Sequence, residues 1–305
     1  DPANDRQTDD SRSVRRLYDD ADTERCFPNP MERSTKALYL RIDREVPMDL
    51  SLILASCFIS LVGLPHGALD PVVAYRNGLI NDWRSIIQFL VLYTGIVAAV
   101  VGLWILAPVL SLIVFLLISS LHFGRDWRTK ISLGGFGYGA FILGLPAWTH
   151  AQQVSEIFGF LVFGASSAFP LIVLQAAGAL GLLLLAFDLQ RLSWIRKLEL
   201  ILLASIAWKL EPLWYFVVYF CAFHSPRHLI AEFRQMRPET RLTAYIVMLT
   251  ITIATLAFAA VSGSHIERYA DRVDIVIYQV LFIGLAALTV PHMCLLEWVG
   301  RKHHE

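Results

Sequence analysis

Three short motifs in this chain repeat one spacing of residues that can bind a metal. In each motif a histidine is followed, four residues later, by an aspartate or a second histidine. The motifs are "HGALD" at 66–70, "HFGRD" at 122–126 and "HSPRH" at 224–228. On a continuous helix, side chains four residues apart lie on one face. The repeated spacing therefore predicts pairs of polar side chains that point in a common direction.

Imidazole is a good ligand for iron, copper, nickel and zinc, and a ligating histidine usually donates its second ring N–H to a carboxylate or a carbonyl. We therefore predict a metal centre with carboxylates behind it. The expected ligands, which also form the catalytic site, are His66, His122, His224 and His228. Asp70 and Asp126 are expected to orient them, although salt bridges of these aspartates to Arg76, Arg125 or Arg227 are an equally good alternative.

A fifth histidine, His292, follows Pro291 as His66 follows Pro65. Its role is open among a fifth ligand, a hydrogen-bond partner for oxygen and a packing residue, and we rank it below the other four. The remaining histidines fit solvated positions in loops and at the C-terminus. They are His150, His265, His303 and His304.

The residue types narrow the chemistry further. No thiolate accompanies the histidines, and the four cysteines are scattered, which argues against copper(I), an iron–sulfur cluster and a disulfide framework. The motifs of zinc metalloproteases, serine hydrolases and phosphate-binding loops are absent. An all-imidazole site fits non-haem Fe(II) with open positions for O₂.

The elements that position these histidines are predicted to be membrane helices. Hydrophobic residues make up 56% of the 305 residues, charged residues only 17%, and the mean hydropathy is +0.54. Long apolar runs in lipid must be helical, because only a helix satisfies its own backbone hydrogen bonds there. Basic and acidic residues balance at 26 each, so no nucleic-acid partner is expected.

The chain divides into a polar N-terminal tail at 1–46 and a transmembrane catalytic domain at 47–305. The fold class is all-α: a polytopic bundle of eight to ten helices around a buried metal site. We place nine segments, and the count becomes eight or ten if the stretch around "EIFGFLVFG" inserts or if "ELILLASIAWKL" is re-entrant. They are 47–65, 84–106, 108–122, 131–147, 167–188, 197–210, 212–231, 242–262 and 274–299.

Basic residues concentrate in the loops after the first, third, fifth and seventh segments, which the positive-inside rule places in the cytoplasm. The five histidines lie toward the C-terminal ends of odd-numbered segments, which cross in one direction. They are therefore expected at one depth, near the cytoplasmic side of the cell membrane. Pro226, between the paired histidines, is expected to kink its helix and turn both rings toward one metal.

The motifs "GLPHGALD", "SSLHFGRDW", "FHSPRH" and "PHM" resemble the Brp/Blh family of membrane β-carotene 15,15′-dioxygenases. The resemblance covers most of 47–299. It implies Fe(II)-dependent cleavage of β-carotene by O₂ at the central double bond to two retinals, which a rhodopsin could accept. It also implies iron ligation by His66, His122, His224 and His228, one for each matching motif position.

Such a substrate offers no polar handle, so only a long apolar tunnel can place one double bond near iron. Tyr215, Tyr219 and Phe223 follow one another at intervals of four and are the expected tunnel lining. Two other classes remain open. One is a di-iron membrane desaturase or hydroxylase, for which the required histidine boxes are incomplete. The other is a non-enzymatic metal, haem or carotenoid-binding membrane protein.

Overall fold

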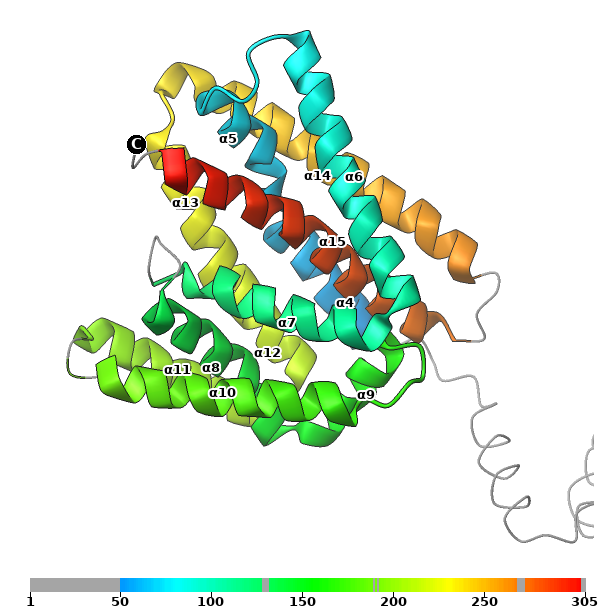
Figure 1. Ribbon diagram of the computed structural model, residues 1–305, viewed down its shortest axis with the longest axis vertical. Helices are drawn as coiled ribbons and strands as arrows, with labels where there is room; N and C mark the ends of the chain where they lie inside the picture. Colours follow the sequence, from blue (N-terminus) through cyan, green and yellow to red (C-terminus); the bar gives the residue numbers. More distant parts are fainter. Residues whose placement is uncertain (1–49, 128–131, 189, 191, 268–271, 303–305) are drawn as a thin grey trace, which may run out of the picture. The chain divides into compact units, whose positions relative to one another are not determined.

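The computed structural model describes residues 50–127, 132–188, 190, 192–267 and 272–302, and these form helices without any strand (Figure 1). The predicted tail at 1–46 and the histidines His303 and His304 lie outside the described residues. The described residues from 50 to 302 belong to one compact unit. The all-α class predicted from the sequence is confirmed.

The first half of this unit contains helices of very different lengths. They are α4 (Leu50–Phe58), η1 (Ile59–Gly63), η2 (Leu64–Leu69), α5 (Asp70–Arg76), α6 (Trp83–Leu106), α7 (Pro108–Gly124), α8 (Leu133–Thr149) and α9 (Ala151–Leu161). Helix α9 covers the "EIFGFL" stretch, which the sequence left open as a tenth element.

The second half contains the remaining helices. They are α10 (Ala168–Asp188), α11 (Trp194–Lys209), α12 (Pro212–Val218), η4 (Tyr219–His224), α13 (Ser225–Gln235), α14 (Pro238–Glu267) and α15 (Val273–Lys302).

Five helical stretches are long and apolar enough to cross a membrane. They are Leu50–Arg76, Trp83–Leu106, Ala168–Phe187, Pro238–His265 and Val273–Lys302, and Pro108–Gly124 is a shorter apolar helix. Helix α6 has 24 residues, which at about 1.5 Å per residue is enough to span a bilayer core. Its Leu92 and Leu106 are 66% and 82% exposed, as lipid-facing leucines would be. The predicted polytopic bundle therefore fits the observed helices.

Helix α6 begins at a well-defined cap. The Asp82 carboxylate accepts a hydrogen bond from the backbone N–H of Ser85 at 2.8 Å, and the Ser85 hydroxyl accepts one from the backbone N–H of Asp82 at 2.9 Å. The backbone N–H of Ser85, and after it the Ser85 hydroxyl, which also donates to the carboxylate, lower the pKa of the Asp82 carboxyl. The reciprocal pair satisfies donors that the first helical turn leaves free.

Two helical stretches change their winding where they carry histidines. The first passes from α4 through the π-helical η1 and the 3₁₀-helical η2 into α5, and the other passes from α12 through the π-helical η4 into α13. The Ser225 hydroxyl donates to the carbonyl oxygens of Val62 and Gly63, at 2.8 and 3.1 Å, and so joins the two stretches. Pro226 lies in the first turn of α13, so the irregular winding precedes the proline. Short π-helical turns are often found at functional sites.

Glycines allow α7, α8 and α10 to approach closely. A Cβ at Gly139 of α8 would lie 1.9 Å from the carbonyl oxygen of Ser120 in α7, and a Cβ at Gly144 would lie 2.7 Å from Cα of Gly178 in α10. Only glycine fits at such crossings, as is common between membrane helices. The end of α7 that carries His122 is thus fixed by backbone-to-backbone packing. Elsewhere in the bundle, α15 packs against α6, and α14 packs against η2.

Candidate metal centre and apolar cavity

The five expected histidines converge. They come from η2, α7, η4, α13 and α15. The centroid of the His66 ring lies 5.1 Å from that of His224, 5.5 Å from His292, 6.0 Å from His228 and 6.2 Å from His122. Four of the five residues are buried, whereas the side chain of His228 is 21% exposed. The convergence predicted from the positions of these histidines in the odd-numbered segments is confirmed.

His66, His122 and His292 each offer one ring nitrogen to a common group in which all three nitrogens lie within 4.8 Å of one another. In His66, Nδ1 lies 2.5 Å from the carbonyl oxygen of Gly63 and must donate to it, so in the neutral ring Nε2 carries the lone pair. In His292, Nδ1 lies 2.6 Å from Oδ1 of Asp70, and the buried Nε2 has no hydrogen-bond partner. A buried nitrogen without a partner is costly unless a cation occupies the space in front of it.

His122 and His224 face each other in a way that also fits a cation. Nδ1 of His224 donates to Oδ1 of Asp126 at 2.9 Å, so its Nε2 carries a lone pair, and this Nε2 lies 2.9 Å from Nε2 of His122. Nδ1 of His122 lies 3.0 Å from Sδ of Met293, which can only accept. Two ligand nitrogens that each lie about 2.1 Å from one metal ion, with an N–metal–N angle of about 90°, are about 3 Å apart. The observed distance between the two Nε2 atoms is close to this value.

Asp126 joins the second potential ligand group, which also contains His224 and His228. Its Oδ1 accepts from Nδ1 of His224 and from Nε2 of His228, at 2.9 and 3.0 Å. Its Oδ2 accepts from the hydroxyl of Tyr219 at 2.6 Å. One carboxylate therefore binds two imidazoles and a phenol.

Asp70 makes a smaller set of contacts. Its Oδ1 accepts from His292, and its Oδ2 accepts from the hydroxyl of Tyr93 in α6 at 2.9 Å. The salt bridges considered as an alternative are not formed, because each arginine pairs with a glutamate instead. These pairs are Arg76 with Glu232, Arg125 with Glu297 and Arg227 with Glu199.

The charges of the cluster support the binding of a divalent cation. The side chains of Asp70 and Asp126 are 2% and 0% exposed, and among the described residues no lysine or arginine forms a salt bridge with either. Two buried negative charges require compensation. An imidazolium at His292 would need an acceptor for its second ring N–H, and Nε2 of His292 has none. Neutral imidazoles around one divalent cation satisfy both the charge and the free lone pairs.

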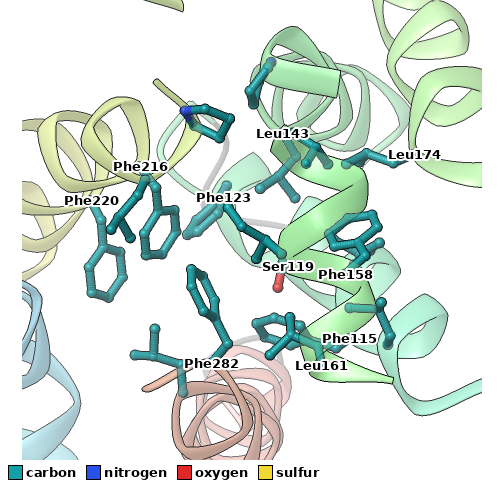
Figure 2. Close-up of a pocket in the computed structure, with 18 of the residues that line it drawn as sticks. Phe115, Ser119, Phe123, Leu143, Phe158, Leu161, Leu174, Phe216, Phe220 and Phe282 are labelled. Atoms are coloured by element: carbon teal, nitrogen blue, oxygen red, sulfur yellow. The ribbon is translucent and has the colours of Figure 1, made fainter. Parts of the chain in front are cut away.

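An apolar cavity of about 110 Å³ extends from His122 between α7, α8, α9, α12 and α15 (Figure 2). Its polar lining consists of His122, Ser119 and Thr289, and the other lining residues are aliphatic, aromatic or proline. In Figure 2 the rings of Phe216, Phe220 and Phe282 lie on one side of the cavity. The cavity is suited to an apolar molecule that approaches the imidazole cluster.

The helix predicted to line a tunnel does line this cavity, but with a different face. Tyr215, Tyr219 and Phe223 are not among the lining residues, which instead include Phe216 and Phe220. Two hydroxyls explain the orientation: Tyr215 donates to the carbonyl oxygen of Ile142 at 3.0 Å, and Tyr219 donates to Asp126. A tyrosine buried in an apolar bundle turns toward an acceptor.

The ring of Phe220 connects the cavity to the histidines. It stacks on Phe216 and on His224, with centroid distances of 5.2 and 5.5 Å.

The sequence alone did not assign Tyr93, Ser119, Phe216 or Phe220 to the site. The isolated tyrosine in the apolar run at 83–106 was a signal for Tyr93, since a phenol in a membrane helix needs an acceptor.

Comparison with known proteins adds independent information. A family model described as "Beta-carotene 15,15'-dioxygenase" matches residues 57–300. The chain is also 30% identical over 268 residues to a protein of uncultured marine bacterium 66A03 named "Beta-carotene 15,15'-dioxygenase", with 82% of this chain and 94% of that protein covered. No solved structure gives a significant match. The matched region contains all five clustered histidines and both buried aspartates.

Proposed function

This chain belongs to the β-carotene 15,15′-dioxygenase family, and from that premise we propose that it cleaves β-carotene at the central double bond. One C40 substrate and one O₂ would give two molecules of retinal, with one oxygen atom in each aldehyde. The observation that carries this proposal is the buried imidazole cluster at the end of an apolar cavity. His122 belongs to both features.

We propose Fe(II) as the metal, held by imidazoles of His66, His122 and His224, with His228 close by. Bound iron would supply the one-electron chemistry that lets O₂ react with a carbon–carbon double bond. The protein's own residues hold the imidazole rings in position. Gly63 and Asp126 fix the rings of His66 and His224, and the buried ring of Phe220 stacks on His224.

The apolar lining supports a hydrocarbon substrate taken from the bilayer. Small-molecule pockets usually measure roughly 300–1,000 Å³, so a cavity of about 110 Å³ must widen to accept a C40 polyene. Phe216 and Phe282, whose ring centroids are 5.6 Å apart, are in position to move apart. Shape then selects the bond that reaches the metal, because the lining offers few polar contacts.

The two potential ligand groups also suggest a di-metal site, as in a desaturase or hydroxylase. Against this alternative, the groups meet at the 2.9 Å contact between His122 and His224, where one ion suffices. Elemental analysis of purified protein distinguishes the possibilities. One iron per chain supports the proposal, and two would favour the alternative.

The function is tested by expressing the chain in a bacterium that makes β-carotene. We expect the pigment to be lost and retinal to accumulate, whereas a His122→Ala variant keeps its carotene. Unchanged carotene in cells that contain folded, iron-loaded protein would refute the cleavage activity. Two aldehydes of unequal length would retain the oxygenase chemistry and refute central cleavage. Membrane orientation and supply of retinal to a rhodopsin stay predictions from the sequence.

A further inference from the structure

We propose that His292 is itself a metal ligand and that Asp70 and Tyr93 act as positioning residues for its ring. The proposal rests on the metal site proposed above and extends it to three segments that are distant in the sequence. Asp70 begins α5, Tyr93 lies in the middle of α6, and His292 lies in α15. No spacing motif links these residues.

The contacts determine the tautomer of His292. Its Nδ1 lies 2.6 Å from Oδ1 of Asp70, and a carboxylate oxygen can only accept, so the ring proton is on Nδ1. The lone pair is therefore on Nε2. This atom is buried, has no hydrogen-bond partner, and belongs to the ring that shares the nitrogen group of His66 and His122.

A packing role does not explain this arrangement. A buried polar atom without a partner destabilises the fold, and a leucine or phenylalanine would fill the same space without that cost. The carboxylate behind the ring adds a second cost, because Asp70 is buried in an apolar bundle and forms no salt bridge with a lysine or arginine among the described residues. Both costs are removed if Nε2 binds a cation, because the cation also balances the charge on Asp70.

Tyr93 completes the arrangement. Its hydroxyl donates to Oδ2 of Asp70 at 2.9 Å, so each carboxylate oxygen has its own donor and the carboxylate cannot rotate freely. Fixed in this way, Asp70 keeps the ring of His292 directed at the cluster. Histidine ligands in metal sites are usually held by such a carboxylate.

His228 provides the contrast. Its Nε2 already faces Asp126 at 3.0 Å, so only its Nδ1 remains for a metal, and its side chain is 21% exposed. His292 is buried, its ring belongs to the common group, and its Nε2 has no hydrogen-bond partner. The geometry therefore favours His292 over His228 as the partner of His66, His122 and His224.

The test measures metal binding separately from activity. Full-length protein in detergent is titrated with Co(II), whose visible spectrum reports the number and geometry of its ligands. Removing even an outer partner of a ligand costs roughly 10–100-fold in metal affinity, so His292→Ala should lose at least about 100-fold. His265→Ala, an exposed histidine of α14, should bind as the wild type does.

Further variants separate a ligand from a residue needed for folding. Added imidazole should restore Co(II) binding to His292→Ala, which loss of a packing residue would not allow. Tyr93→Phe preserves the ring and should bind Co(II) several-fold more weakly with a similar spectrum. Gel filtration and thermal unfolding show whether each variant is folded.

The outcomes are distinct. Wild-type Co(II) affinity and an unchanged spectrum in His292→Ala would overturn this inference, and the cleavage activity could still be intact. If imidazole fails to restore binding to folded His292→Ala, His292 is not a ligand. If the wild type binds neither Co(II) nor Fe(II), the proposed function fails first.

Discussion

The two buried carboxylates of the cluster use similar contacts for different tasks. Asp70 accepts from one imidazole and one tyrosine, whereas Asp126 accepts from two imidazoles and one tyrosine. The Asp70 contacts hold a single ring of α15. The Asp126 contacts also tie the end of α7 to η4 and α13, so we expect this second aspartate to matter for folding as well as for metal binding.

The comparison also shows that the repeated motif does not define the pairs. Asp70 does not bond to His66, four residues before it, but to His292. Asp126 does not bond to His122 but to His224 and His228. In both cases the carboxylate supports a histidine of another helix, so each aspartate connects elements that the chain places far apart.

The largest effect is expected for Asp126→Ala. The change leaves two imidazole N–H groups and the Tyr219 hydroxyl without an acceptor, and each orphaned buried donor costs roughly 1–3 kcal/mol. We expect loss of bound metal and a markedly lower thermal unfolding midpoint in detergent. Glu297→Ala serves as the control, because its partly exposed salt bridge with Arg125 should contribute at most about 1 kcal/mol. Equal destabilisation by both changes would contradict the role given to Asp126.

A smaller effect is expected for Asp70→Asn. The amide oxygen can still accept from His292, but the negative charge behind the ring is gone. We expect metal affinity to fall by roughly 10–100-fold with little change in the unfolding midpoint. Titration with Co(II) measures the affinity. Wild-type affinity would show that the Asp70 charge does not support a ligand.

The two tyrosines sharpen the comparison. Tyr93→Phe and Tyr219→Phe each remove one hydrogen bond to a buried carboxylate. Tyr219→Phe should lower mainly the unfolding midpoint, and Tyr93→Phe should lower mainly metal affinity. In the double variant Asp70→Asn with Tyr93→Phe, the losses of affinity should not add, because both act through His292. Strictly additive losses would argue that Tyr93 acts elsewhere.

The smallest effect on the metal is expected from the cavity. Phe216→Ala enlarges the space beside the cluster without touching a ligand, so metal content should be unchanged. Carotene cleavage should slow or yield some aldehydes of unequal length, which chromatography detects. Phe223→Ala on the same helical stretch is the matched control, since Phe223 does not line the cavity. A larger change in products from Phe223→Ala than from Phe216→Ala would support the tunnel lining predicted from the sequence.

The sequence by itself determined the class of fold and the identities of the clustered histidines. Apolar runs in lipid must form helices, and the positions of His66, His122, His224, His228 and His292 near the ends of such runs placed them at one level. These are one-dimensional properties, set by hydropathy and helix direction. They required no knowledge of which helices are neighbours.

Only the tertiary structure decided which carboxylate meets which imidazole and which aromatic face lines the cavity. The partners of Asp70 are 23 and 222 residues away, and helix packing alone brings them together. In the stretch from α12 to η4, the neighbours Tyr215 and Phe216 point in different directions. The Tyr215 hydroxyl donates to the carbonyl oxygen of Ile142, and the Phe216 ring lines the cavity. A buried hydroxyl follows its acceptor, and the position of the acceptor is a property of the packed bundle.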